Sequence, residues 1–264
     1  PYAQPQATGV DETAARVQAH PRITVHLNST LAETSGAPGR FLAKVAQESG
    51  AVTEEKVGAI VQATGFSTYD IAKLPELGGG QINVVDQAGL EALARAADGS
   101  AIKRADGKEV KSVVFVQCAG QRGSGGNGDG SHLEYCSGHC CATSIKQAMY
   151  FKDANPDVDT VVLFTDLRMP GNNEDFYRAA QNKGVIFSKG VVSGVSANGG
   201  GCTVKFKDLI LNEETSTEAD LVVLATGMQP NTGPDLDALA EANRAAEGGS
   251  EEAKEQVIQM KAKS

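Results

Sequence analysis

The sequence contains no long apolar run, no cluster of basic residues and too few cysteines for a disulfide-stapled scaffold. Its longest hydrophobic stretches, such as Val113–Val116 and Val161–Phe164, are the length of strands, far short of the ~18 residues that a membrane-spanning helix needs. The formal net charge is −9, which argues against non-specific binding to nucleic acid. Apolar residues make up 41% and charged residues 22% of the 264 positions, as is ordinary for a globular protein. The composition therefore predicts a globular chain with no membrane span and no nucleic-acid partner.

The N-terminus has neither an initiating Met nor a signal peptide, since the chain begins Pro-Tyr-Ala-Gln. Such a start fits a mature protein or an excised piece of a longer chain. Four of the five cysteines lie between Cys118 and Cys141. This crowding predicts metal or redox chemistry in a reducing compartment.

Alternating apolar strands and amphipathic helices predict an α/β fold, with a parallel sheet and an attached β meander. The strand Ser112–Gln117 is apolar nearly throughout, as parallel strands covered on both faces are. Asp11 is a plausible N-cap for the first helix. The expected helices are Asp11–His20, Asp86–Ala97, Cys140–Asp153 and Glu174–Lys183. The expected strands are Ile23–Leu27, Arg40–Ala46, Lys56–Gln62, Ser112–Gln117, Thr160–Thr165, Val185–Ser188, Val191–Ser196, Cys202–Lys207 and Leu221–Leu224.

An internal repeat relates the segment Ile23–Gly65 to the segment Ile186–Gly227. Each copy has an early strand, a turn with glycine, a meander strand and a closing apolar strand that ends in Ala-Thr-Gly. Glycine at the end of a strand lets the backbone pass close to a bound group. Two-domain flavoproteins of the disulfide-reductase type end each nucleotide-binding lobe in this way, so Gly65 and Gly227 are candidate residues of a flavin site.

The loop between the first and second cysteines contains Gly123-Ser-Gly125-Gly-Asn-Gly128, which formally matches a dinucleotide-binding fingerprint. That motif requires a helix to begin at once, so that its N-terminus meets the pyrophosphate. Here a further polar segment intervenes before Cys140, and Asp166 lies too far along the chain to be the expected acidic residue. We interpret the segment as a glycine-rich loop.

Cysteines occupy the place where a dinucleotide-binding unit would have its phosphate loop. Cys118 directly follows a strand, and Cys136, Cys140 and Cys141 lie at the start of the next helix. Free backbone N–H groups and the helix dipole at that start lower a thiol pKa and stabilise anionic thiolates. Four thiolates match the ligand demand of a [4Fe-4S] cluster, whose separate irons can accept adjacent cysteines.

Three other interpretations of these cysteines remain. Structural zinc takes four thiolates, usually as paired C-x2–4-C knuckles, whereas the spacing here is C-x17-C-x3-C-C. A redox-active disulfide could join Cys136 to Cys140 or Cys141. The thiols could also be buried and unligated, as is expected of Cys202 in its strand-like segment.

Charged and imidazole side chains surround the cysteines in the sequence. His139 could donate a hydrogen bond to a bound cluster. Arg122, Lys146 and Arg168 could offset its negative charge. Ordinary surface positions are the alternative for all four, and for His132.

The segments around these cysteines closely resemble the flavin-bearing A subunit of heterodisulfide reductases. They also resemble its relatives in the quinone-interacting membrane-bound oxidoreductase complex of sulfate reducers. The resemblance covers roughly residues 10–235. Its motifs are Val114-Phe-Val-Gln-Cys118-Ala-Gly, Tyr135-Cys136-Ser-Gly-His-Cys140-Cys141-Ala-Thr-Ser-Ile-Lys146-Gln-Ala, Thr165-Asp166-Leu-Arg168-Met-Pro-Gly171 and Glu174-Asp-Phe-Tyr177.

The resemblance implies a thioredoxin-reductase-like core that carries FAD. It also implies a [4Fe-4S] cluster in the lobe that would otherwise bind NADPH, with ligands corresponding to Cys118, Cys136, Cys140 and Cys141. Such subunits pass electrons between flavin, clusters and partner redox subunits. The implied location is the cytoplasm, alone or in association with a membrane-bound complex.

The chain also departs from the family pattern, because the N-terminal glycine fingerprint for FAD is absent. We therefore expect a central fragment with an incomplete flavin site, inactive by itself. Its expected parts are a remnant of the FAD lobe over 1–105, a cluster-bearing nucleotide-binding-like lobe over 106–235 and a helical tail over 236–264. The leading hypothesis is an electron-transfer module. The alternatives are a flavin- or NAD(P)H-dependent dithiol oxidoreductase that uses Cys136, Cys140 and Cys141, and a zinc-stabilised interaction domain.

Overall fold

A computed structural model describes residues 7–122, 132–133, 135–232 and 236–262. The chain divides into two compact units between Thr64 and Gly65. The sequence placed a boundary near residue 105 instead. The reason for the difference is that β5 (Val84–Asp86) pairs with β11 (Leu221–Leu224) and so belongs to the sheet of the second unit.

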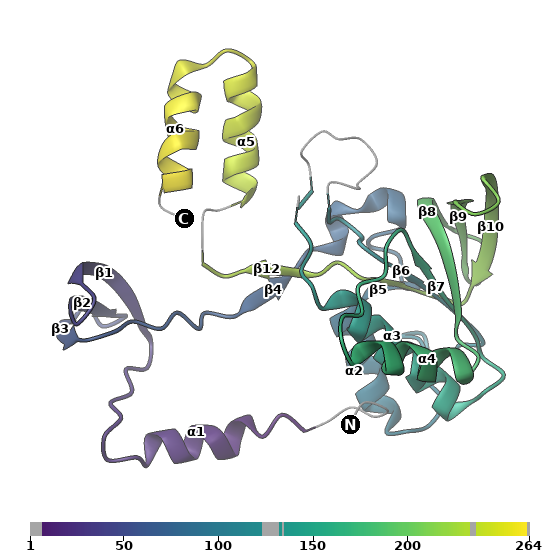
Figure 1. The fold of residues 1–264 in the computed structure, drawn as a ribbon, viewed down its shortest axis with the longest axis horizontal. Helices are drawn as coiled ribbons and strands as arrows, with labels where there is room; N and C mark the ends of the chain where they lie inside the picture. Colours follow the sequence, from purple (N-terminus) through teal and green to yellow (C-terminus); the bar gives the residue numbers. More distant parts are fainter. Residues whose placement is uncertain (1–6, 123–131, 134, 233–235, 263–264) are drawn as a thin grey trace. The chain divides into compact units, whose positions relative to one another are not determined.

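The first unit contains one helix and a three-stranded antiparallel sheet in the order β1-β2-β3 (Figure 1). The predicted N-cap is wrong: Gly9 takes that position without a side-chain hydrogen bond, and Asp11 lies in the first turn. The elements are α1 (Val10–Gln18), β1 (Ser29–Ala37), β2 (Arg40–Gln47) and β3 (Val52–Val57).

Two strands expected in this unit are not formed as the sequence predicted. Residues 23–27 are irregular, and their apolar side chains Ile23, Val25 and Leu27 are largely exposed. The third strand ends at Val57 rather than Gln62. Alternation of apolar residues makes a strand only where a partner strand and a covered face exist, and neither is present among the described residues at these positions.

The second unit is built on a seven-stranded sheet in the order β10-β9-β8-β7-β6-β11-β5 (Figure 1). The five strands from β8 to β5 run parallel, and β8, β9 and β10 form an antiparallel meander. The α/β class with a parallel sheet and a β meander is thereby confirmed. The strands not yet defined are β6 (Ser112–Val116), β7 (Asp159–Phe164), β8 (Ile186–Ala197), β9 (Cys202–Asp208) and β10 (Glu213–Ala219).

The central strands are buried on both faces, as their continuous apolar sequences predicted. In β6, Val113 and Phe115 pack with the helices, whereas Val114 and Val116 pack against the opposite face. That opposite face is covered by the meander and by the short 3₁₀ segments Ile71–Lys73 and Pro75–Leu77. The helices are α2 (Gln87–Ala97), α3 (Cys140–Ala154) and α4 (Asn173–Asn182).

The meander differs from the sequence prediction in detail. The two expected strands around Val185 and Val191 are one strand, β8, with an irregularity between Val192 and Gly194 that lets it bend. The strand β10 was not predicted, because its sequence Glu-Glu-Thr-Ser-Thr-Glu-Ala is polar. It forms at the edge of the sheet, where most of its side chains remain exposed to water.

The internal repeat has a structural counterpart. A three-stranded antiparallel meander comes before each Ala-Thr-Gly in the sequence, and a three-residue strand follows it. The closing apolar strand predicted for both copies forms only in the second, as β11. The two three-residue strands, β4 (Phe66–Thr68) and β12 (Met228–Pro230), pair with each other antiparallel, with Ser67 opposite Gln229 at the centre. The paired short strands extend the similarity of the two copies beyond the residues that the sequence suggested.

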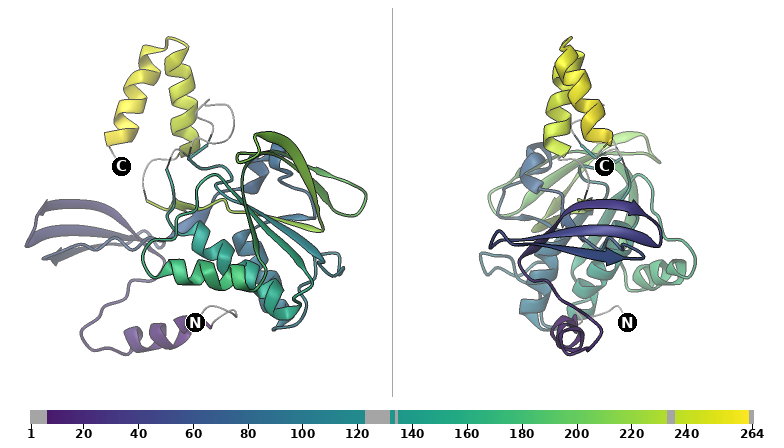
Figure 2. Two further views of the ribbon diagram at one scale, coloured as in Figure 1. Left: turned by 45° about the vertical axis from the view of Figure 1, so that its right-hand side comes forward. Right: turned by 90° about the vertical axis from the view of Figure 1, so that its left-hand side faces the viewer.

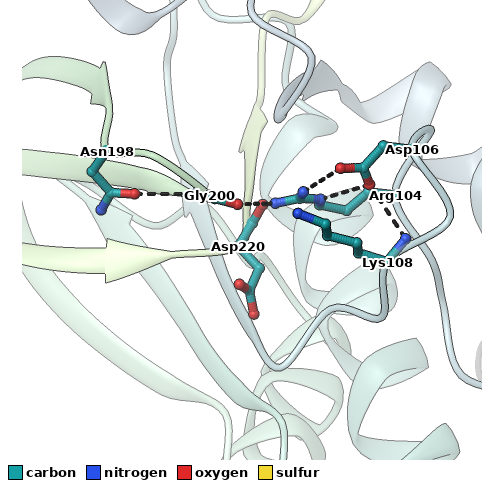
Figure 3. Close-up of polar contacts among 7 residues, drawn as sticks. Arg104, Asp106, Lys108, Asn198, Gly200 and Asp220 are labelled. Atoms are coloured by element: carbon teal, nitrogen blue, oxygen red, sulfur yellow. Dashed lines mark hydrogen bonds and ion pairs between the residues drawn. The ribbon is translucent and has the colours of Figure 1, made fainter.

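A buried arginine joins the meander to the segment before β6. Arg104 is 5% exposed, and its guanidinium donates to the carbonyl oxygens of Gly200 and Asp220 and to the carboxylate of Asp106 (Figure 3). A buried cation is tolerated only when it is paired in this way. Arg104 therefore fixes the loop between α2 and β6 against the end of β10.

The C-terminal segment is helical, as predicted. It forms two helices, α5 (Leu236–Glu247) and α6 (Glu251–Ala262), which are joined by a turn that contains Gly248 and Gly249. The two helices pack against each other (Figure 2). Across the described part of the chain, no helix combines the length and the hydropathy needed to cross a bilayer.

Candidate functional site

The candidate site lies at the carboxyl edge of the parallel sheet. Cys118 follows β6, Asp166 follows β7, and Gly227 follows β11. From β6 the chain continues to the neighbouring strand β7 and then to β8 on one side of the sheet. The neighbour of β6 on the other side, β11, comes much later in the chain, so the strand order reverses between β6 and β11. In open α/β sheets this reversal of strand order creates the crevice in which ligands bind.

A tight turn after β6 presents the first cysteine. Cys118 has a φ of 58°, in a left-handed region that residues other than glycine rarely adopt. The turn is closed by the N–H of Gln121, which donates to the carbonyl of Cys118. Gly120 packs on the ring of Tyr69, where an added Cβ would lie 2.8 Å from a ring carbon. Strained backbone of this kind persists where the surrounding structure holds it, often at functional sites.

The start of α3 presents two more cysteines. Cys140 and Cys141 occupy its first turn, and both are buried. The side chain of Gln87 donates to the carbonyl oxygen of Cys140 at 2.9 Å and to Ser144 Oγ at 2.8 Å. Since Gln87 is the first residue of α2, the α2–α3 contact fixes the position of the α3 N-terminus.

The four sequence-predicted cysteines lie near enough to act on one another, since the other three all affect the Cys140 thiol. The pKa of the Cys140 thiol is raised to about 12, chiefly by burial and also by the charges of Cys141, Cys118 and Cys136. Burial also raises the pKa values of Cys141 and Cys118. The expectation that the helix start lowers these pKa values is therefore wrong for the metal-free chain, because desolvation outweighs the dipole.

Two arginines act on the thiols, and the expected lysine does not. The backbone N–H of Arg168 donates to Cys141 Sγ at 3.4 Å and opposes the rise of the Cys141 pKa. A hydrogen bond from Arg122 likewise opposes the rise of the Cys118 pKa. Lys146 instead pairs with Glu91 of α2 at 3.5 Å.

Buried polar atoms without partners lie in the residues that precede the cysteines. Both side-chain polar atoms of Gln117 and the Nδ1 atom of His139 have no hydrogen-bond partner. Gln117 is only 8% exposed, and burial lowers the pKa of His139. Unpaired buried polar groups are costly, so a further group that accepts a hydrogen bond would satisfy the Gln117 Nε2 donor next to Cys118 in the chain. The sulfur atoms of an iron–sulfur cluster accept such bonds.

The structure also shows what the cysteines do not form. All five are free thiols. Among the described residues, no three His, Cys, Asp or Glu side chains are arranged to hold a single metal ion. His132, expected at the surface, accepts or donates a 2.9 Å hydrogen bond to the Tyr69 hydroxyl.

A clasp of side chains ties the cysteine segments to the end of β11, and no sequence pattern indicated it. Gln121 exchanges hydrogen bonds with Ser137. The Ser137 hydroxyl in turn accepts from the N–H of Met228 at 2.8 Å. Gly227 fits against the Gln121 amide so closely that an added Cβ would lie 1.9 Å from its nitrogen. Local patterns could not reveal the clasp, because its members come from two connections far apart in the sequence, the one between β6 and α3 and the one that leads from β11 into β12.

The two Ala-Thr-Gly glycines have different surroundings. Gly65 (φ 71°) accepts a hydrogen bond from the N–H of Asn231, and an added Cβ would meet only the Asn231 side chain, at 3.7 Å. Gly227 (φ 76°) is packed against Gln121. The fingerprint Gly123–Gly128 lies outside the described residues.

The contrast between these glycines predicts a difference in stability. We expect Gly65→Ala to cost about 1–2 kcal/mol, the strain of a left-handed alanine. Gly227→Ala should cost about 1–3 kcal/mol more, because the Gln121 side chain must move and break its bonds to Ser137. Urea unfolding of both variants measures the difference. Equal losses for the two would show that the clasp does not restrict position 227.

No protein-family model matches the chain. Curated proteins, by contrast, do match the chain. The A subunit of the H(2):CoB-CoM heterodisulfide,ferredoxin reductase of Methanothermobacter thermautotrophicus is 34% identical over 187 residues, which is 68% of this chain. The iron-sulfur A subunit of the CoB--CoM heterodisulfide reductase of Methanocaldococcus jannaschii is 35% identical over 193 residues, or 70% of this chain.

The chain belongs to the family of heterodisulfide reductase A subunits. The family resemblance expected from the cysteine motifs is thus confirmed. The chain spans 28% of the length of each of these two relatives.

Solved structures that match the chain include the thioredoxin reductase of T. acidophilum, with 15% identity over 84% of this chain and 58% of that one, at a TM-score of 0.43. Another is the bacillithiol disulfide reductase of Bacillus cereus, with 13% identity over 87% of this chain and 57% of that one, also at 0.43.

Proposed function

We propose that the chain is an electron-transfer module of a heterodisulfide-reductase-like iron–sulfur flavoprotein. In this proposal Cys118, Cys136, Cys140 and Cys141 hold a [4Fe-4S] cluster. The observation that carries the proposal is the gathering of four electrostatically coupled thiols at the switch point of the sheet. Relatives in the family are named iron-sulfur subunits.

The protein's own residues supply the surroundings of such a group. The turn after β6 and the first turn of α3 position three of the thiols, and the α2–α3 contact holds that helix start in place. Gln117 and the backbone N–H of Arg168 offer donors for sulfur, and Arg122 offers a positive charge. When bound, a [4Fe-4S] cluster would supply one-electron transfer. The thiols would have to lose their protons on binding, and the raised pKa values of Cys118, Cys140 and Cys141 oppose this unless the metal is present.

The flavin belongs to the proposal for the complete protein. Gly65 and Gly227 directly precede the strands β4 and β12, which pair with each other. We propose that the first unit is part of an FAD-binding lobe, and that the partners are other redox subunits of a heterodisulfide-reductase-like or quinone-interacting complex. The reductase names of the relatives support this assignment.

The raised thiol pKa values weigh against the dithiol alternative. A nucleophilic thiol must be ionised near neutral pH, whereas burial keeps Cys140 and Cys141 protonated there. The zinc alternative needs four ligands around one ion, and the described side chains show no such arrangement.

Anaerobic reconstitution with iron and sulfide, followed by iron and acid-labile sulfide analysis, tests the proposal. We expect about four irons and four sulfides per chain, a brown protein and an EPR signal after one-electron reduction. A colourless protein with stoichiometric zinc would support the interaction domain instead. Thiol titration that changes with an added dithiol reductant, without iron uptake, would support the dithiol enzyme.

A further inference from the structure

Arg122 and Asp166 form an ion pair at the site, and a backbone hydrogen bond also fixes the position of Arg122. The N–H of Arg122 donates to the carbonyl of Tyr135 at 3.2 Å. The Arg122 Nη2 atom donates to Asp166 Oδ2 at 2.8 Å. Arg122 lies four residues after Cys118 and Asp166 lies just past β7, so the pair bridges the ends of adjacent strands.

The pair is poorly explained by stability alone. The side chains of Arg122 and Asp166 are 28% and 56% exposed, and ion pairs this open to water contribute little to folding. Arg122 also has a φ of 61°, a conformation that is unfavourable for arginine. Such strain at the edge of a ligand crevice points to a role in the site.

The Arg122 guanidinium pairs with Asp166 and also acts on the first cysteine. Arg122 directly follows Gln121, whose N–H closes the turn on the Cys118 carbonyl, and the positive charge of Arg122 opposes the rise of the Cys118 pKa. Asp166 acts on Cys118 with the opposite sign. Arg168 and Lys189 also act on Asp166, and both stay unchanged in the variants below.

We propose that Arg122 and Asp166 set the reduction potential of the cluster held at Cys118, Arg122 by raising it and Asp166 by lowering it. The proposal rests on the proposed function of the four cysteines. One-electron reduction adds a negative charge to the site, and no bond forms or breaks in the protein. A cation beside a ligand sulfur favours the reduced state, and a carboxylate behind that cation weakens its field.

Redox titration of the reconstituted chain, followed by EPR, tests the proposal with single and double variants. We expect Arg122→Gln to shift the one-electron equilibrium about tenfold toward the oxidised state, which is about 59 mV lower in potential. Asp166→Asn should shift it toward the reduced state. Arg122→Lys should stay near the parent, and the Arg122→Gln/Asp166→Asn double variant should lie between the two single variants.

The matched control is Arg178→Gln, which removes an arginine from an exposed ion pair with Glu174 on α4. The control should leave the potential unchanged. The shifts of the test variants should shrink as ionic strength rises, because the pair is open to solvent.

Shifts of the reduction potential in opposite directions for the Arg122 and Asp166 variants distinguish this electrostatic role from a structural one. If both substitutions only loosened the turn, they would shift the potential in the same direction. Shifts of the same sign, or none beyond the control, would overturn the proposal while leaving the cluster assignment intact. A parent chain that takes up no cluster would overturn the proposed function and this inference together. Should Arg122→Gln lose the cluster, the sign of the Asp166→Asn shift and the behaviour of Arg122→Lys still decide.

Discussion

Replacing any one of Cys118, Cys136, Cys140 or Cys141 with alanine should abolish or severely reduce cluster incorporation. Each thiolate is expected to ligate one iron, and the loss of one strong ligand leaves that iron open to water and to oxidation. Iron and sulfide content after anaerobic reconstitution measures the effect. We expect at most about a tenth of the parent's iron, on the scale by which loss of even an outer partner lowers metal affinity about 10–100-fold.

Cys202→Ala is the matched control. Cys202 is fully buried in β9 and lies in the core opposite the helices. Its replacement should leave iron content unchanged and cost only about 1 kcal/mol of stability, from the small cavity. If Cys202→Ala lost iron as fully as the other four variants, or if any one of those four kept full iron, the ligand assignment would be wrong.

Removal of the cluster should unfold the site while the core of the sheet survives. A group that binds only the native state stabilises it in proportion to its affinity, and structural metal sites supply on the order of 10 kcal/mol. We therefore expect chelation to lower the melting temperature by about 10 °C or more. The strands β6 and β11 are buried on both faces by packed apolar side chains, so they should remain folded.

Hydrogen exchange measured before and after chelation locates the change. Protection should fall at Thr143, whose N–H bonds to His139, and at Arg168, whose N–H bonds to Cys141. Amides of β11 should stay protected. The Cys118→Ala variant given the same treatment is the control, since it has no cluster to lose. Uniform loss of protection, or none at Thr143 and Arg168, would contradict the placement of the cluster.

The regular elements around the site could be predicted because their signals are local. The strands β6, β7 and β11 are short apolar runs of a length that only a buried strand fits. The helices α2 and α3 begin within one residue of the predicted positions, and Asp86 caps α2 by accepting from the N–H of Gly89. Turns at glycine, helix caps and the periodicity of apolar residues are all determined by residues adjacent in sequence. They can therefore be recognised without knowledge of the tertiary structure.

The failures have the opposite cause. Residues 23–27 alternate like a strand and form none, whereas the polar β10 forms one because β9 supplies its hydrogen bonds. The thiol pKa values were expected to fall and instead rise, because burial depends on what packs over the helix start. The pairing of Lys146 with Glu91 depends on the packing of α2 against α3.

By itself, the sequence determined the α/β class and the family, and it singled out the four cysteines as candidate ligands. Composition, periodicity and motif spacing are properties of the chain alone. Only the tertiary structure decided that these cysteines lie near one another at the switch point of the sheet, that Arg122 pairs with Asp166, and that Gln121 packs against Gly227. These contacts join segments separated by tens of residues. Their geometry is fixed by strand order and helix packing, which no local pattern encodes.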